Sequence, residues 1–391
     1  MYKYASSYCQ NAKQIIQSYS PSTPFASFLK QYFTTHKKFG SKDRKAITEA
    51  CYAYFRLGKA VASLEIEKAI AVGIFLTEKH INLWQNIFSP EWMDALHWDL
   101  NEKIDFLQKQ AILPDNFNPF FGVEYVSKNI NVYNFSLSHL QQPNTFIRVR
   151  PKFQKEISKK LQSQNIEHKI QHNSIAFEQK VNIESFAILN KEVVVQDYSS
   201  QQLSTLMQLI PSSNYQKKVW DCCAASGGKS ILAVDFLGKI ELHVSDVRQS
   251  ILHNLKKRLA VAQIPIYSCE VKDLSKPQTQ NNLFDIIIAD VPCTGSGTWG
   301  RTPENLLFFD EKEIATFQQL QQKIITNSIA SLKQGGYYLF ITCSVFTKEN
   351  EDNVQFIQKH FGLEVIQQQY FIGYENRADT MFGALMLKPK I

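Results

Sequence analysis

Two cysteines in the C-terminal half of the chain stand where catalytic thiols are expected. Cys293 follows the apolar segment 284–290, and Cys343 lies near the end of the apolar segment 335–344. Asp290 precedes the first of them by three positions. The thiolate form of cysteine is a strong nucleophile, and its formation depends on the charges around it. Two thiols at the ends of neighbouring strands beside a carboxylate therefore favour nucleophilic catalysis by one or both.

The seven cysteines of the chain do not form a disulfide framework or a metal site by their spacing. Their number is odd and no two of them make a C-x-x-C pair. We therefore expect free thiols in a reducing compartment and no zinc or other metal. A buried structural role is the alternative for each cysteine, and it is the role that we assign to three of them: Cys9, Cys51 and Cys269.

A loop of small residues, CCAASGGKS at 222–230, follows the apolar segment 219–223. Small side chains let the backbone approach a ligand closely, and the next helix offers free N–H groups to an anion or a carboxylate. A Walker phosphate loop would need glycine at position 223, where Cys223 stands. The G-x-G-x-x-G pattern at 295–300 follows the fourth strand and lacks the opening strand–turn–helix context of a dinucleotide site.

Three aspartates end successive predicted strands: Asp246, Asp273 and Asp290. A carboxylate after the second strand of such a sheet is placed to accept the ribose hydroxyls of a nucleoside cofactor. Helix capping or a turn is the alternative role for each aspartate alone. Three in series behind a small-residue loop favour an adenosyl ligand without a pyrophosphate, such as S-adenosylmethionine.

The elements that must position these residues alternate between strands and helices. The apolar segments predicted as strands are 219–223, 240–246, 265–271, 284–290 and 335–344, with helices expected at 249–263 and 311–333. Continuous apolar strands separated by helices indicate a parallel-rich sheet covered on both faces, a Rossmann-like α/β fold. In this fold the ligand lies at the carboxyl ends of the strands.

The first third of the chain is predicted to be helical. Apolar residues repeat at helical spacing within 25–33 and again within 47–55, with Asp43 as the expected N-cap and Gly58 as the stop of the second helix. Basic residues lie around both stripes: Lys30, Lys37, Lys38, Lys42, Arg44, Lys45, Arg56 and Lys59. They form either an ordinary solvated face or a surface that faces RNA.

A basic segment follows, with strands expected at 145–150 and 188–196 around a helix at 152–165. Residues 148–170 hold seven Lys and Arg against two acids. These are Arg148, Arg150, Lys152, Lys155, Lys159, Lys160 and Lys169. Phe146 and Phe153 either stack on bases or belong to the core. The asymmetry of charge favours a polyanionic partner.

Length and composition agree with a soluble multidomain protein. The 391 residues are 44% hydrophobic and 20% charged, with a net charge of +7, and they include no apolar run of membrane-spanning length and no secretion signal at the N-terminus. We expect a cytoplasmic monomer.

Three motifs resemble those of the NOL1/NOP2/Sun family of RNA cytosine-5 methyltransferases: DCCAASGGKS at 221–230, DVPCTGSGTWGRTPE at 290–304 and TCSVFTKENEDNV at 342–354. QDYSSQ at 196–201 and DTMFGALMLKP at 379–389 resemble the lead-in and closing segments of that family. SKDRKAITEACYAYFRLG at 41–58 resembles the NusB-like RNA-binding domain of its bacterial ribosomal RNA enzymes. The implied domains are a helical NusB-like domain at 1–125, a small basic α/β segment at 126–205 and a methyltransferase domain at 206–391.

The resemblance implies a role for each motif residue. Cys343 would attack C6 of cytosine, Cys293 would release the product, Asp290 would bind the N3/N4 edge of the base, and Lys229 would support thiolate formation. S-adenosylmethionine would contact Cys223, Ala224, Ala225, Ser226, Gly227, Gly228, Lys229, Asp246, Arg248, Asp273 and Asp290. The RNA partner implied is small-subunit (16S) ribosomal RNA.

The chain departs from the family pattern at two positions. Ser226 replaces a proline in the small-residue loop, which we expect to reduce rigidity but not to change the binding mode. Gly300 leaves Arg301 as the remaining member of a basic pair, which weakens one expected phosphate contact.

Two other functions stay open. One is S-adenosylmethionine-dependent methylation of tRNA or of a substrate that is not RNA, and the other is a catalytically silent RNA-binding assembly factor. Glu349, Asn350 and Glu351 either position the thiol loop or cap the next helix.

Overall fold

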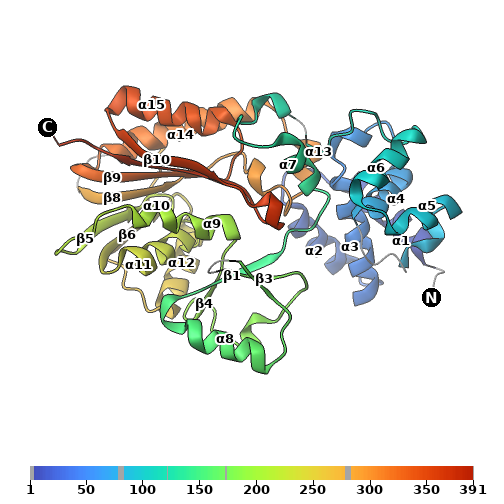
Figure 1. Cartoon of the computed structure of the whole chain (residues 1–391), viewed down its shortest axis with the longest axis horizontal. Coiled ribbons are helices and arrows are strands. Elements are labelled where there is room, and N and C mark those ends of the chain that lie inside the picture. The colour runs from blue at the N-terminus through green and yellow to red at the C-terminus, as the bar shows by residue number, and fades with distance from the viewer. Residues whose placement is uncertain (1–3, 78–82, 121, 172–173, 278–282, 391) are drawn as a thin grey trace. The chain divides into compact units, whose positions relative to one another are not determined.

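The computed structural model describes residues 4–77, 83–120, 122–171, 174–277 and 283–390 (Figure 1). Contacts divide the chain into two compact units. The first comprises residues 1–124, 131–142 and 299–310, and the second comprises residues 125–130, 143–298 and 311–391. The predicted segment 126–205 lies mostly in the second unit, and the predicted three-part division stays a prediction.

The first unit is helical, as the apolar spacing predicted. Its α-helices are α1 (Ala5–Ser18), α2 (Phe25–Thr35), α3 (Ser41–Phe55), α4 (Ile66–Thr77), α5 (Pro90–Asp94), α6 (Leu100–Lys109), α7 (Val132–Ser138) and α13 (Glu304–Phe308). Short 3₁₀ turns are η1 (Gly58–Val61), η3 (Gln85–Ile87) and η4 (Ala95–His97). Phe25, Leu29 and Phe33 of α2 are buried on one face, together with the apolar side chains of α1 and α3. The i, i+4, i+8 spacing therefore forms the core of this unit.

Two expectations about α3 were wrong in detail. The helix is capped by Gly40, and Asp43 lies three residues further on, where its Oδ2 accepts the backbone N–H of Gly40 at 2.9 Å. Arg56 belongs to the interior and not to a basic surface, because it is 3% exposed. Its guanidinium donates to the carbonyl oxygens of His139 and Gly300 at 2.6 and 3.1 Å. An arginine that satisfies buried carbonyls in this way is a structural residue.

The second unit contains two sheets. The smaller sheet has the strand order β2-β3-β1-β4, all antiparallel, and α8 (Gln154–Ser163) contributes Ile157 and Leu161 to its core. Its strands are β1 (Thr145–Val149), β2 (Lys169–Gln171), β3 (Ser174–Phe177) and β4 (Val193–Val195). The strand, helix and strand predicted between 145 and 196 are confirmed, although β4 is shorter than expected.

The larger sheet has the strand order β10-β11-β9-β8-β5-β6-β7. Its strands are β5 (Lys217–Asp221), β6 (Ile240–Asp246), β7 (Ser268–Val271), β8 (Phe284–Asp290), β9 (Leu332–Thr342), β10 (Glu364–Phe371) and β11 (Met381–Leu387). The pairs from β9 to β7 are parallel, and β11 pairs antiparallel with β9 and β10. The predicted parallel-rich Rossmann-like fold is confirmed.

Helices cover both faces of this sheet (Figure 1). One face packs against α11 (Gly228–Leu237) and α12 (Gln249–Val261), and the other packs against α14 (Lys312–Ile329) and α15 (Glu351–Phe361). Alternate residues of β8 serve the two cores, with Ile286 and Ile288 on the first face and Ile287 and Ala289 on the second. The remaining helical segments of this unit are α9 (Tyr198–Gln202), α10 (Ser204–Gln208), η6 (Pro151–Phe153), η7 (Ile183–Ser185), η8 (Ser296–Thr298), η9 (Thr347–Glu349) and η10 (Tyr374–Asn376).

In the basic segment, the expectation that all seven cations face a polyanion was wrong for two of them. Arg148 and Arg150 lie in or next to β1 and are ion-paired with Asp235 of α11, at 2.5 and 2.8 Å. Their side chains are 3% and 13% exposed, so they are not free to meet a polyanion. Phe146 is buried and belongs to the core. The exposed cations that remain in this segment are Lys152, Lys155, Lys159 and Lys169.

Candidate active site

The two predicted thiols lie side by side. Cys293 follows β8 and Cys343 follows β9, and these strands are parallel neighbours in which Asp290 pairs with Ile341. The two Sγ atoms are 3.3 Å apart, and both residues are part-exposed. The hydrogen bond to Cys343, burial, and the charges of Cys343 and Glu349 raise the pKa of the Cys293 thiol well above its usual value. Cys293 is therefore the thiol that stays protonated.

Lys229 and Asp290 form an ion pair beside the thiols. Lys229 lies in the first turn of α11, and its Nζ is 2.8 Å from Oδ2 of Asp290 at the end of β8. Burial alone would lower the pKa of Lys229, but the charge and hydrogen bond of Asp290 outweigh it, and the charge of Cys343 acts in the same direction. The pKa of Lys229 is therefore raised, so this side chain is a cation and not a proton acceptor at neutral pH.

The small-residue loop adopts the tight backbone that its composition predicts. Ala225 and Gly227 have φ of +46° and +86°, and Gly227 is the N-cap of α11. A Cβ atom added at Gly228 would meet no atom within 4 Å, so this part of the loop faces open space. The loop thus presents backbone and small side chains at the N-terminus of a helix, as expected for close approach of a ligand.

A buried carboxyl group, that of Asp221, is hydrogen-bonded to Ser230 at the end of this loop. Asp221 ends β5, is fully buried, and accepts a hydrogen bond from Oγ of Ser230 at 2.6 Å. Its other oxygen, Oδ1, has no partner among the described residues. Burial raises the pKa of Asp221 to about 7, and the hydrogen bond from Ser230 opposes this only in part.

Ser226, which stands where the family has proline, is bound by an arginine. Nη1 of Arg258 donates to Oγ of Ser226 at 3.0 Å and to its carbonyl at 3.3 Å. Nε of the same guanidinium donates to Oδ1 of Asn190 at 2.6 Å. The loop is thus tied to α12 and to the turn before β4, and these hydrogen bonds provide restraint at the position where the proline is missing.

The two remaining strand-end aspartates behave differently from each other. Asp246 is buried and ties the loop to its own strand, because it accepts from the backbone N–H of Ala225 at 3.0 Å and from that of Arg248 at 2.9 Å. Nε of Arg248 adds a third bond at 3.1 Å. Asp273 instead accepts from the N–H of Ser275 two positions later, at 3.0 Å, which is the geometry of a turn residue. Its contribution to ligand binding stays a prediction.

The glycines of the G-x-G-x-x-G pattern serve chain packing. A Cβ atom at Gly297 would lie 2.0 Å from the carbonyl oxygen of Thr380, and the N–H of Gly297 donates to the carbonyl of Cys343 at 2.9 Å. Glycine is therefore required at 297 so that the loop after β8 can meet the loop after β9. The structure thus gives Gly297 a packing role.

The sequence left Glu349 with two possible roles, positioning of the thiol loop or capping of the next helix, and the structure places its carboxylate between the two thiol loops. Glu349 ends η9, is fully buried, and accepts hydrogen bonds from Thr294 and Ser344, the residues next to Cys293 and Cys343. Gln321 of α14 joins the same carboxylate at 2.9 Å. The sequence carried no local signal for Gln321, because it is one of several glutamines in a helix and only the fold selects it.

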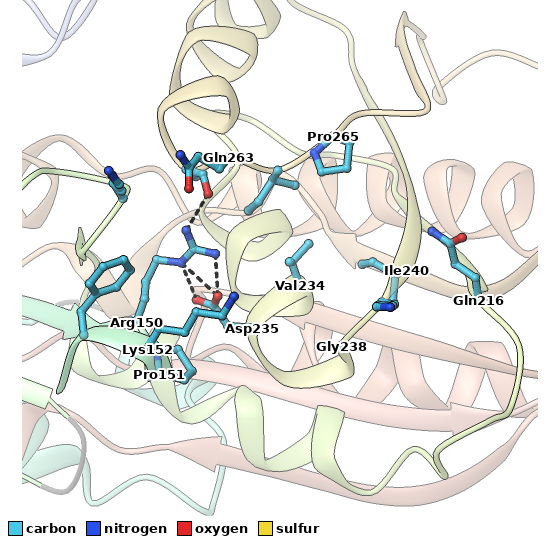
Figure 2. Close-up of a pocket in the computed structure, with 15 residues that line it drawn as sticks. Arg150, Pro151, Lys152, Gln216, Val234, Asp235, Gly238, Ile240, Gln263 and Pro265 are labelled. Carbon is cyan, nitrogen blue, oxygen red and sulfur yellow. Dashed lines mark hydrogen bonds and ion pairs between the residues drawn. The ribbon is translucent and has the colours of Figure 1, made fainter. Parts of the chain in front are cut away.

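One cavity lies at the opposite ends of the strands, away from the thiols. It measures about 430 Å³ and is lined by residues around Arg150, Asp235, Gly238, Ile240 and Gln263 (Figure 2). Two helices, α11 and α12, end at this cavity, so their carbonyl groups face it. Helix C-termini attract cations, which accounts for the arginine and lysines there without a ligand. We assign the cavity no part in the thiol site.

The described ranges contain neither a metal-binding group nor a membrane-spanning helix. No group of three or more His, Cys, Asp or Glu in them is arranged to hold a metal ion. Among the same residues, no helix is long and apolar enough to cross a bilayer.

The sheet order, the helices on both faces and the loop at the start of α11 define a Rossmann-like domain. Residues 206–383 match the family model described as 16S rRNA methyltransferase RsmB/F. This match confirms the resemblance to the Sun-family RNA methyltransferases for this part of the chain.

Curated relatives and solved structures agree with this assignment. Ribosomal RNA small subunit methyltransferase B of Yersinia pseudotuberculosis is 31% identical over 171 residues, which are 43% of this chain and 39% of that protein. The same figures hold for the protein of that name from Yersinia pestis. The chain therefore spans about two fifths of the length of these relatives.

The structural likeness extends further along the chain and shows the fold. A methyltransferase homolog protein from Pyrococcus horikoshii superposes with a TM-score of 0.55 at 18% identity, covering 77% of this chain and all of that one. NSun6 from Pyrococcus horikoshii, solved with SFG, has a TM-score of 0.55 at 15% identity and covers 69% of this chain and all of that one.

Proposed function

We propose that this chain transfers a methyl group from S-adenosylmethionine to C5 of a cytosine in RNA through a covalent adduct with Cys343. The observation that carries the proposal is the pair of Sγ atoms 3.3 Å apart beside the Lys229–Asp290 ion pair. The RsmB/F match over residues 206–383 supports RNA as the substrate, and small-subunit (16S) ribosomal RNA is the species that we propose. We also propose that the protein acts as a monomer in the cytoplasm.

The chemistry needs a temporary nucleophile because C5 of cytosine is weakly reactive. The thiolate of Cys343 forms a bond to C6, and the electron pair displaced from the C5=C6 bond makes C5 nucleophilic. C5 then takes the methyl group that bound S-adenosylmethionine supplies. A base removes the C5 proton, the double bond re-forms, and the sulfur of Cys343 leaves.

The surroundings of the thiols support this division of roles. Cys343 lies near the cation Lys229, whose pKa its charge helps to raise, whereas Cys293 lies near the carboxylate of Glu349, which raises the pKa of that thiol. A thiolate beside a cation and a thiol beside an anion are the protonation states that electrostatics favours. Cys343 is thus the nucleophile and Cys293 the thiol that assists release of the product.

Asp290 is placed to recognise the base once the target cytosine has left its stack. Its Oδ2 is held by Lys229, so the carboxylate has a fixed orientation at the carboxyl end of β8. The carboxylate accepts a hydrogen bond from the N4 amino group, and from N3 once that nitrogen is protonated, so it favours protonation of N3 as the adduct forms. Because the ion pair is part-buried, Lys229 orients Asp290 and need not transfer a proton.

The loop around Gly227 fits the proposed cofactor. Gly228 faces open space, and the N-terminus of α11 offers N–H groups to a carboxylate. We propose that residues 223–229 hold the methionine part, and that Asp246, Arg248 and Asp273 hold the nucleoside. SFG is an analogue of this cofactor, and the Pyrococcus NSun6 structure solved with it supports S-adenosylmethionine as the cofactor.

The RNA around the target is proposed to contact exposed lysines in both units. Those of the first unit are Lys30, Lys37, Lys38 and Lys42, and those of the second are Lys152, Lys155 and Lys159. Neutralisation of phosphates by such side chains makes binding dependent on salt.

The test is transfer of labelled methyl groups to RNA by the purified chain and by two cysteine variants. Cys343→Ala should lose all turnover and form no adduct, whereas Cys293→Ala should accumulate a protein–RNA species that survives denaturant. Methyl transfer to protein but not to cytosine in RNA would favour the alternative substrate class. If Cys343→Ala leaves the cellular role intact, the chain is an assembly factor and the proposal is wrong.

A further inference from the structure

The carboxylate of Glu349 connects the two loops that carry the thiols. Its Oε1 accepts the backbone N–H of Thr294 at 2.9 Å, and its Oε2 accepts the hydroxyls of Thr294 and Ser344, both at 2.5 Å. Thr294 follows Cys293 and Ser344 follows Cys343. One buried side chain thus binds the residue next to each sulfur.

The carboxylate is itself held from the neighbouring helices. Nε2 of Gln321 donates to Oε1 of Glu349 and to the carbonyl of Pro292, both at 2.9 Å. Nδ2 of Asn353 donates to Oε1 of Gln321 at 2.7 Å and to the carbonyl of Glu349 at 3.0 Å. Gln321, Asn353 and Glu349 are fully buried, so solvent does not replace these bonds if one is lost.

Further hydrogen bonds join the two loops at the same place, among them one from Oγ1 of Thr294 to Oγ of Ser344 at 3.4 Å. Oγ of Ser296 lies 3.2 Å from Oγ of Ser344 and accepts the N–H of Val345 at 2.9 Å. The N–H of Gly297 donates to the carbonyl of Cys343. The strands end before these loops begin, so the pairing of β8 and β9 by itself does not determine how far apart the two sulfurs lie.

We propose that Glu349 is a positioning residue that holds the Cys293 loop against the Cys343 loop and so sets the 3.3 Å separation of the sulfurs. The inference deepens the proposed function, because the separation matters to a reaction in which both thiols address one base. Glu349 touches neither the cofactor loop nor the Lys229–Asp290 pair, so its effect passes through the two loops alone.

The charge of Glu349 has a second consequence at the same site. It is among the charges that raise the pKa of the Cys293 thiol. Burial raises the pKa of Glu349, and the four hydrogen bonds donated to its carboxylate oppose this only in part. An uncharged amide at this position therefore changes both the position and the electrostatics of the Cys293 loop.

The first test measures how fast the two thiols form a disulfide without RNA or cofactor, a rate that depends on how close together they lie. Diamide oxidises two neighbouring thiols to a disulfide: two S–H bonds break, one S–S bond forms, and the diamide N=N group takes up two electrons and two protons. We expect Glu349→Gln to slow formation of the Cys293–Cys343 disulfide at least tenfold, measured by mass spectrometry. The reason is that the NH2 group of glutamine is itself a donor and would face the donors that now bind the carboxylate oxygens. Gln321→Leu, which keeps the carboxylate, should slow it about threefold.

Glu351→Gln is the matched control. Glu351 accepts hydrogen bonds from Ser127 and Tyr370 in the same unit but makes none to either thiol loop. Its variant should oxidise at the wild-type rate, so loss of a neighbouring, part-buried acid is separated from loss of Glu349. A Glu349→Gln rate within twofold of wild type would overturn the proposal.

The second test follows catalysis. Glu349→Gln should lower kcat for methyl transfer at least tenfold and leave the Kd for S-adenosylmethionine, measured by calorimetry, within twofold of wild type. Glu349→Asp, which keeps the charge on a shorter side chain, should recover part of the loss. If the wild-type chain methylates no cytosine, the proposed function fails, while the diamide rates still report on Glu349. Equal losses of kcat in Glu349→Gln and Glu351→Gln would count against positioning.

Discussion

The cluster of Arg148, Arg150 and Asp235 gives the most demanding test of how this protein is held together. Arg148 donates to Asp235 at 2.5 Å, and Arg150 reaches both oxygens of the same carboxylate, as Figure 2 shows. Burial lowers the pKa of Arg148, while the charge of Asp235 opposes this. One carboxylate therefore pairs with two guanidinium groups that have lost most of their water, and the cluster keeps a net charge of about +1.

Replacing Asp235 by alanine leaves two buried cations that face each other. Removal of one partner of a buried ion pair costs about 3–5 kcal/mol, because the other charge stays desolvated. With two guanidiniums dependent on one carboxylate, we expect a loss of about 4 kcal/mol in the free energy of unfolding. At a urea dependence of about 3 kcal/mol per molar, the unfolding midpoint should fall by about 1.3 M.

Urea unfolding of the full chain measures this loss, with Lys152→Gln as the matched control. Lys152 lies in the same segment but is exposed, and no ion pair involves it in the described part of the chain. Its variant should stay within about 0.5 kcal/mol of wild type. Replacing the cluster as a whole with Arg148→Met, Arg150→Met and Asp235→Leu should recover most of the stability.

A loss below 1 kcal/mol for Asp235→Ala would refute this reasoning. So would an Arg148→Met variant that binds RNA more weakly while unfolding at the wild-type urea concentration. That second result would return Arg148 to the RNA-facing role that its position in a basic segment suggested.

Two further predictions concern the small-residue loop at 222–230 and the carboxyl group beneath it. The pKa of Asp221 is raised from 3.8 to about 7 in the folded chain, so the folded state holds the proton more tightly than the unfolded state does. The stability that this proton contributes is full below pH 4 and is lost as the pH rises through 7. The difference in pKa corresponds to about 4 kcal/mol. Asp221→Asn should therefore unfold at nearly the same urea concentration at pH 5 and pH 8, whereas the wild-type midpoint should fall over this range. An equal fall in both proteins would contradict the raised pKa of Asp221. At the other end of the loop, Arg258→Ala removes the bonds to Ser226 and should raise the Kd for S-adenosylmethionine about fivefold in calorimetry, as loss of about 1 kcal/mol implies. Ser226→Pro should bind within twofold of wild type, and an unchanged Kd in Arg258→Ala would show that the loop needs no such restraint.

Much of the fold was predictable because its determinants are local. The buried strands β6 and β8 begin and end where their apolar runs do, and the helices α2 and α3 follow the apolar spacing. The edge strand β10 was missed, because one of its faces is exposed and its glutamine-rich sequence carries no apolar run. The strand-end positions of Asp290, Cys293 and Cys343 also followed from the local pattern.

Whether a charged side chain is buried, and which groups it contacts, could not be predicted from local sequence in the same way. Arg56, Arg148 and Arg150 belong to segments that look basic and exposed, yet each is directed inward by partners far along the chain. Glu349 resembles an ordinary residue at a helix start, although it accepts hydrogen bonds from residues beside both thiols.

The sequence by itself determined the buried strands of the larger sheet, the main helices and the residue types at the strand ends, because apolar periodicity and motif spacing are properties of short stretches of chain. Only the tertiary structure decided that two sulfurs 50 positions apart lie 3.3 Å from each other, and which cations are buried and which are free. The physical reason is that the energy of a charge or a polar atom depends on its partners and its access to water. Both are set by contacts between segments that the sequence separates.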